Sequence, residues 1–177
     1  MNIFTFPFGL REFYARPDTS ISDDTNFYVP DGISGLLLIP FIYLKIDRAG
    51  KAIAEQFAQR HYSFCGHGIH ICGTDEYSAL TNKTGDFSYK KALYNSLDNS
   101  TFLSKTVKAE EFDFKKYAAE FSTKNFNNSV EIVSKYMSLR SGDIIAQELS
   151  PLTKIDVKTQ LNGNAVIYGD LKVSVIC

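Results

Sequence analysis

A long run of apolar residues dominates the first third of the chain. It extends from Leu36 to Ile46, is rich in aromatic and β-branched side chains, and is bounded by Gly35 and Asp47. The run is too short for a transmembrane helix, and its composition favours a strand. The pattern therefore predicts a buried strand near the centre of the fold. We expect an edge position or an irregularity at Pro40, because proline cannot donate a hydrogen bond to a neighbouring strand.

The segments on either side of this run predict further strands and two helices. Alternating apolar and polar residues predict a short strand over residues 2–6 and a longer strand over residues 64–74. Apolar residues at helical spacing predict a short helix within residues 51–62, with Phe57 on its apolar face, and a second helix over residues 129–137. The chain therefore combines helices with an abundance of strands, which indicates an α+β fold that is rich in β structure.

The C-terminal segment predicts a closing meander of three strands. The strands cover residues 155–161, 165–168 and 171–175, and Gly-containing turns separate them at residues 162–164 and 169–170.

Composition and charge limit the classes of protein to which this chain can belong. With 177 residues the chain is long enough for one sizeable core, so we expect a single domain over residues 1–177. Lys and Arg number 19 against 20 Asp and Glu, which leaves a net charge of −1 and no electrostatic reason to expect nucleic acid or a membrane as a partner. The N-terminal residues lack the pattern of a signal peptide, so we expect a cytoplasmic protein. Cys65, Cys72 and Cys177 form no disulfide framework.

Several short motifs, in order along the chain, resemble the core of the fumarylacetoacetate hydrolase family. They are Tyr28-Val29-Pro30-Asp31, Tyr43-Leu44-Lys45-Ile46, Arg48-Ala49-Gly50-Lys51, Gly66-His67-Gly68-Ile69, Asp75 and Ser138-Leu139-Arg140-Ser141-Gly142-Asp143. The resemblance covers nearly the whole chain. It implies a fold like the C-terminal domain of that family, a mixed β-roll or sandwich with a few short helices.

The resemblance also implies the positions of a metal site. In that family the long strand carries an acidic-x-acidic pair that binds a divalent metal, and a later strand supplies an aspartate. These places fall on Ile39, Phe41 and His70 in this sequence. Mg or Mn, the metals expected of the family, need hard oxygen ligands, which Ile39 and Phe41 do not offer. We therefore expect no metal cofactor.

The substrate side of the family's site is partly retained. Arg16, Pro17 and Asp18 match a substrate-side loop, and Lys91 matches a lysine near the metal. The family's segment with the catalytic histidine is missing, since no histidine precedes His61.

A second substrate loop is mostly changed. In the relatives a Thr-Gly-Thr-Pro-like loop holds the substrate. Here Pro151 alone is retained, and Glu148 enters the segment.

Four residues remain as candidates for chemistry: His70, Cys72, Lys91 and Glu148. Cys72 and His70 share one face of the predicted strand, as a nucleophile and base would. A zinc site using both, with His67, is the alternative, although strand alternation points His67 the other way. Simple lining of a core or pocket is a third interpretation. Lys91 either binds an anion or is a solvated lysine, and Glu148 either replaces a lost carboxylate or lies on the surface.

Three hypotheses for function follow. The first is a catalytically degenerate relative of the family with a binding or assembly role, because metal, base and substrate loop are all altered together. The second is a hydrolase, decarboxylase or isomerase that acts on a small keto or dicarboxylic acid with a rearranged site. The third is a subunit that pairs with a catalytically complete relative. We expect a homodimer or such a pair, with a small anionic ligand as another possible partner.

Overall fold

The computed structural model describes most of the chain in two compact units. The described residues are 1–31, 33, 35–73, 97–117, 121–149, 153–156 and 165–176, with only the backbone described for 153–156. Unit 1 contains Met1–Asp18, Phe41–His67 and Lys105–Leu149, and unit 2 contains Thr19–Pro40, Gly68–Ser104 and Ser150–Cys177. Two long strands, β4 (Gly35–Ile46) and β5 (Tyr62–Gly73), each contribute residues to both units. The expectation of a single domain stays a prediction.

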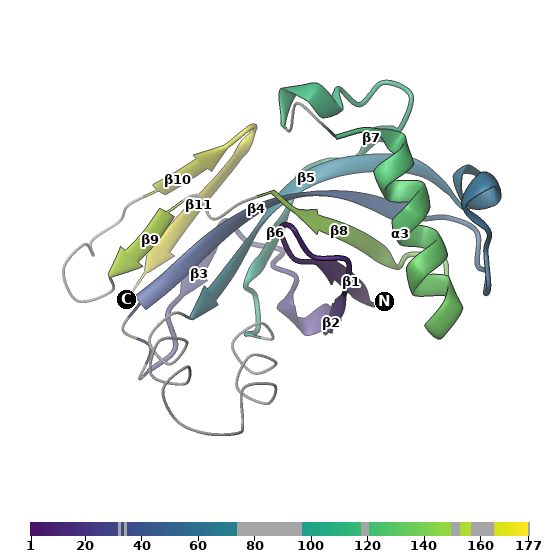
Figure 1. Ribbon diagram of the computed structural model, residues 1–177. Coiled ribbons are helices and arrows are strands. Elements are labelled where there is room, and N and C mark those ends of the chain that lie inside the picture. The colour runs from purple at the N-terminus through teal and green to yellow at the C-terminus, as the bar shows by residue number, and fades with distance from the viewer. Residues whose placement is uncertain are drawn as a thin grey trace. The chain divides into compact units, whose positions relative to one another are not determined.

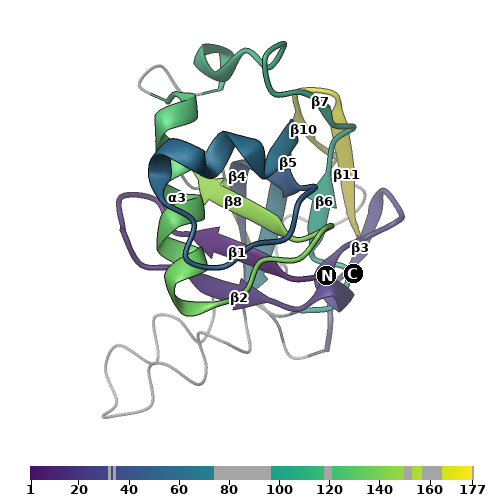
Figure 2. The same ribbon diagram turned by 90° about the vertical axis from the view of Figure 1, so that its right-hand side faces the viewer.

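Unit 1 is built on a mixed sheet with the strand order β2, β1, β8, β4, β5 and β7. The short strands are β1 (Ile3–Phe6), β2 (Tyr14–Arg16), β7 (Val107–Lys108) and β8 (Ile144–Glu148). Strand β1 runs parallel to β8 and antiparallel to β2, and β8 runs antiparallel to β4. Figure 2 shows β2, β1 and β8 in succession, with helix α3 beside them.

One face of this sheet packs against helix α3 (Thr123–Tyr136). The helix begins before the predicted start, because the side chain of Asn125 accepts a hydrogen bond from the backbone N–H of Ser122 at 3.0 Å and closes a capping box. Its buried side chains include Phe126, Val130 and Val133. They join a core whose other buried members are Phe4, Phe6, Ile42, Leu44, Ile46, Ile53, Ala58, Tyr62, Cys65, Phe112, Leu139 and Ile145.

A buried carboxylate joins the N-terminus to the start of β8. The Oδ1 atom of Asp143 accepts a hydrogen bond from the backbone N–H of Asn2, and Oδ2 accepts one from the backbone N–H of Arg140, both at 2.8 Å. Gly142, at φ +95°, makes the tight turn before Asp143. The motif Ser138-Leu139-Arg140-Ser141-Gly142-Asp143 thus ends in a turn that leads into β8.

Unit 2 contains the other halves of β4 and β5 and a separate sheet. Strand β9 (Thr153–Asp156) pairs antiparallel with the first residues of β4, and β6 (Thr101–Leu103) pairs antiparallel with the second half of β5. The separate sheet consists of β10 (Ala165–Tyr168), β11 (Leu171–Ile176) and β3 (Asn26–Tyr28), with β10 and β11 forming a hairpin (Figure 1). The core of unit 2 contains Phe27, Leu36, Leu38, Ile69, Ile71, Phe102, Val173 and Val175.

The central strand is confirmed, and its pairing partner changes around Pro40. Residues Gly35–Leu38 of β4 pair with β9, whereas Phe41–Lys45 pair with β8. Pro40 lies between these two stretches, where neither strand needs a hydrogen bond from its nitrogen.

The short helix predicted within residues 51–62 is present as the 3-10 helix η2 (Glu55–Arg60), but Phe57, expected on its apolar face, is 43% exposed. A left-handed residue, Ala52 at φ +53°, prevents an earlier helix start. In the C-terminal segment the predicted pairing of residues 165–168 with residues 171–175 is confirmed, whereas β9 pairs with β4. The rest of the predicted first strand and its turn, residues 157–164, lie outside the described residues. The remaining 3-10 helices are η1 (Asp18–Ser20) and η3 (Phe114–Lys116).

No helix in the described part of the chain has both the length and the apolar character needed to cross a membrane.

Candidate functional site

The two β4 positions that the resemblance assigns to metal ligands are apolar and buried. Ile39 is 9% exposed and Phe41 is 0% exposed. Ile39 belongs to unit 2 and Phe41 to unit 1. The Phe41 ring lies 6.1 Å from the Tyr43 ring, and Tyr43 in turn packs directly over the backbone of Gly66. In unit 1 the face of β4 that carries Phe41 and Tyr43 is therefore filled by aromatic packing.

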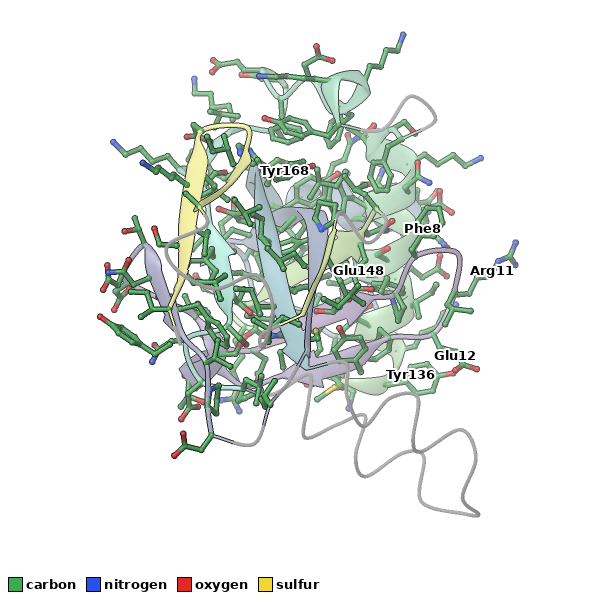
Figure 3. The ribbon with its side chains drawn as sticks, turned by 90° about the vertical axis from the view of Figure 1, so that its left-hand side faces the viewer. Phe8, Arg11, Glu12, Tyr136, Glu148 and Tyr168 are labelled. Carbon is green, nitrogen blue, oxygen red and sulfur yellow. The ribbon has the colours of Figure 1, made fainter. Side chains whose placement is uncertain are left out.

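Glu148 lies opposite Phe41 across the β4–β8 pair. Residues opposed in this way share one face of the sheet. The phenol of Tyr14, from strand β2, donates a hydrogen bond of 2.7 Å to the Oε1 atom of Glu148. Figure 3 labels Glu148. The half-buried carboxylate thus joins the end of β8 to β2 and is not a fully solvated surface group.

Residues 16–18 separate into buried and exposed positions. Arg16 is 1% exposed and lies two residues from Tyr14 on the same side of β2. Asp18 is exposed, and its Oδ2 atom lies 3.7 Å from the N-terminal amine of Met1. Pro17 connects them. Of these residues, only the Arg16 side chain enters the interior of unit 1.

His70 belongs to a buried hydroxyl network in unit 2. Its Nδ1 atom lies 3.1 Å from Oγ1 of Thr101, and that hydroxyl donates to Oγ of Ser20 at 3.3 Å. All three side chains are 0% exposed. Because each hydroxyl can donate or accept, this network accommodates either tautomer of the imidazole.

The cysteine and the second histidine of this strand are also buried. Cys72 is 4% exposed, and Cys65 is a fully buried free thiol. His67 stacks on the Tyr117 ring at a centroid distance of 4.8 Å in unit 1. Burial raises the pKa of the Cys65 thiol to about 12, so this thiol is held in its neutral form. Among the described residues, no group of three or more His, Cys, Asp or Glu is placed to hold a metal.

Some predicted site residues lie outside the described residues. They are Lys91, Asp75, Pro151 and Cys177. Their roles stay predictions.

Sequence reasoning missed the partners of the candidate residues. Tyr14 follows Phe13 shortly before Arg16, but nothing in this spacing indicated a hydrogen bond to Glu148. Ser20 and Thr101 come from separate segments that only the fold brings to His70. A lone hydroxyl residue carries no sequence signal for such a contact.

The arrangement matches solved structures of fumarylacetoacetate hydrolase type across the whole chain. A Yersinia pestis protein described as a member of that family is 13% identical with a TM-score of 0.74, covering 99% of this chain and 93% of its own. An Escherichia coli protein described as an isomerase is 13% identical with a TM-score of 0.72, covering 99% of this chain and 91% of its own. Fumarylpyruvate hydrolase from Pseudomonas aeruginosa, solved with Mn²⁺ and pyruvate, is 13% identical with a TM-score of 0.70, covering 99% of this chain and 89% of its own.

Comparison by sequence does not assign the chain to a family. No protein-family model matches the chain, and no curated protein matches it. The structural similarity is nevertheless consistent in three proteins and extends over 99% of the chain in each. The chain therefore has the fold of the fumarylacetoacetate hydrolase family.

Proposed function

We propose that this protein keeps the fumarylacetoacetate hydrolase fold without its metal-dependent chemistry, and that it has a binding or assembly role in the cytoplasm. The observation that carries the proposal is the state of Ile39 and Phe41. Both side chains are apolar and buried, and Phe41 packs against Tyr43. Buried apolar side chains at these two positions stabilise the sheet, and they offer no ligand to a metal ion.

The donor set does not fit the divalent metal that the fold family implies. Mg²⁺ and Mn²⁺ take oxygen ligands at short, fixed distances. Ile39 and Phe41 supply none, and the third position, His70, is engaged with the Thr101 hydroxyl. Replacing carboxylates by hydrocarbon also removes the charge that offsets the cost of dehydrating the ion.

Two further features support the loss of hydrolysis. The chain passes from β1 to β2 through residues 7–13, and this connection contains no histidine to serve as the family's base. In the segment where the resemblance implies a substrate-holding loop, Glu148 is engaged by the Tyr14 phenol. Acid–base catalysis and substrate positioning would both need groups that these segments lack.

The proposal is tested by metal binding and turnover together. Titration calorimetry with Mn²⁺ and Mg²⁺ should show no binding. Incubation with fumarylpyruvate and either metal should give no pyruvate, with the Pseudomonas aeruginosa fumarylpyruvate hydrolase as the positive control. Restoring acids by Ile39→Glu, Phe41→Glu and His70→Asp should still give no turnover, because the base segment is absent.

A second candidate function is an enzyme with a rearranged site for a small keto or dicarboxylic acid. It is favoured by the presence of an imidazole at His70 and a carboxylate at Glu148, since both groups can act in general acid–base catalysis. Lys91 and Cys72 would complete such a site. Turnover of a keto acid that His70→Gln and Glu148→Gln both abolish would favour this enzyme over the binding protein.

The partners remain proposals. A small anionic ligand bound by Lys91, a homodimer and a pair with a complete relative are each compatible with a binding role. Isolation of the protein from its native cells, followed by mass spectrometry, would distinguish a relative from a second copy.

A further inference from the structure

A cavity of about 550 Å³ lies at the surface of unit 1, and none of the former metal positions lines it. Its walls come from the end of η2, the start of β5, strand β7 with the turn that follows it, and the start of α3. The residues that line it include Gln59, Tyr62, Phe64, Lys108, Glu110 and Thr123. Ligand pockets in proteins commonly have volumes of roughly 300–1,000 Å³. The cavity is therefore large enough for a small organic molecule.

One wall of the cavity is aromatic. The Phe64 ring is 41% exposed, whereas Tyr62, two residues earlier on β5, is 4% exposed. The phenol of Tyr62 donates a hydrogen bond of 2.8 Å to Oδ1 of Asn127 on α3, which holds this side chain in place. Phe64 thus offers the face of its ring to a planar apolar group, beside a ring that is already fixed.

A charge of each sign lies beside this aromatic wall. Lys108 is directly opposite Phe64 in the β5–β7 pair, so the two side chains lie on one face of the sheet. Glu110 follows Lys108 by two residues, and both charged side chains are exposed. In the described part of the chain, neither of them takes part in an ion pair. Both charges are therefore available to a ligand.

Backbone hydrogen bonds hold the two charged residues in a defined arrangement. The N–H of Ala109 donates to the carbonyl of Ser63 at 2.9 Å, which extends the pairing of β7 with β5. The N–H of Glu111 donates to the carbonyl of Lys108 at 2.9 Å and closes a turn. A pocket that is ordered before binding loses little conformational entropy when a ligand enters it.

These groups define the chemistry of a fitting ligand. A carboxylate would accept hydrogen bonds from Nζ of Lys108, and an ammonium group would donate to the carboxylate of Glu110. A planar ring would pack on Phe64. An aromatic α-amino acid carries its carboxylate and its ammonium group on one carbon atom, with the ring attached nearby. It therefore supplies all three parts in a small volume.

We propose that this cavity binds an aromatic α-amino acid, with its carboxylate at Lys108, its ammonium group at Glu110 and its ring on Phe64. This inference names a ligand for the binding role proposed above and rests on that role. It assigns the ligand to a cavity that the changes at the former metal positions leave intact.

Other small ligands fit the cavity less well. A phosphate or a dicarboxylate would meet the negative charge of Glu110 as well as the positive charge of Lys108, and like charges placed together weaken binding. An uncharged apolar ligand would remove both charged groups from water without giving either a partner, which costs free energy. A zwitterion avoids both penalties.

Ligand-observed NMR titration of the intact chain with L-phenylalanine tests the proposal. We expect a dissociation constant below about 1 mM. Two analogues each lack one charge: phenylpropanoate has no ammonium group, and phenethylamine has no carboxylate. Each should bind at least about tenfold more weakly than L-phenylalanine, because one charged side chain of the cavity then loses its partner.

Variants of the lining residues test the location. Lys108→Gln and Glu110→Gln should each weaken the binding of L-phenylalanine at least about tenfold, and Phe64→Ala should weaken it about threefold or more. Lys108→Gln should not weaken the binding of phenethylamine, which has no carboxylate for the lysine to bind. Lys115→Gln and Glu111→Gln, exposed charges close in sequence that do not line the cavity, are the matched controls and should change nothing.

The outcomes separate this inference from the proposed function. No binding of L-phenylalanine, equal binding of the singly charged analogues, or binding that is insensitive to the three lining variants would each overturn the inference. None of these results changes the expected loss of Mn²⁺ binding and turnover, which tests the proposed function independently. The substituted side chains are exposed, and circular dichroism of every variant establishes that it is folded.

Discussion

The phenol of Tyr14 donates a 2.7 Å hydrogen bond to Oε1 of Glu148, and this contact joins the edge strand β2 to the end of β8 across the intervening strand β1. A short hydrogen bond to a charged acceptor is stronger than one between neutral groups. The two residues come from the substrate-side segments that the family resemblance identified. In this protein those segments bind one another.

A double-mutant cycle on this pair should therefore show coupling. We expect Tyr14→Phe to lower the free energy of unfolding by about 1–2 kcal/mol, since the carboxylate loses a donor while half-buried. Glu148→Ala removes the acceptor of the same hydrogen bond, so both single variants abolish the contact. Urea denaturation of the two single variants and the double variant gives the coupling energy. Effects that add within about 0.3 kcal/mol would show that the contact contributes nothing to stability.

The close packing of Tyr43 over Gly66 gives a second prediction. A Cβ atom at position 66 would lie 2.6 Å from Cζ of Tyr43, well inside contact distance. Gly66→Ala should therefore lower the free energy of unfolding by about 1–3 kcal/mol, a typical cost of overpacking. The variant Tyr43→Leu removes the obstructing ring, so in that background the same glycine substitution should cost much less. An equal cost in both backgrounds would show that Tyr43 is not the obstruction.

The raised pKa of Cys65 predicts a loss of stability in alkaline solution. An unfolded thiol ionises near a pKa of about 8.5, whereas burial raises the pKa of Cys65 in the folded protein to about 12. Between these values the folded state keeps a proton that the unfolded state has lost. The free energy of unfolding therefore falls as pH rises, by up to about 1.4 kcal/mol per pH unit from this group.

Chemical denaturation at pH 7, 8.5, 9.5 and 10 measures this dependence. Cys65→Ala lowers the stability at every pH, since it leaves a cavity, but it should remove this part of the slope. Tyr62, whose pKa is also raised by burial and by its neighbour Cys65, adds its own dependence only at higher pH. Parallel curves for the two proteins between pH 8.5 and 10 would contradict the assignment.

The fold was largely accessible from the sequence because its strongest signals are local. The apolar run of β4 predicts a strand by length and composition alone, and Pro40 predicts the break in its pairing. What the sequence could not show is which strand pairs with which. Residues 153–156 have a strand-like pattern in either arrangement, and only the fold shows that they pair with the apolar first half of β4.

For the candidate site, the sequence shows only which functional groups are missing. The apolar character of Ile39 and Phe41 is visible in the sequence, and the structure adds that both are buried. The partners of His70 and Glu148 were not accessible, because Thr101, Ser20 and Tyr14 reach them from segments far apart along the chain.

The central claim is that the β4 face has exchanged metal ligands for hydrocarbon. Calorimetric titration of the unmodified protein with Mn²⁺, run beside a fumarylpyruvate turnover assay, tests it most directly. We predict no heat of binding above that of dilution and no pyruvate formed. Stoichiometric Mn²⁺ binding, together with turnover that depends on the metal, would contradict the account.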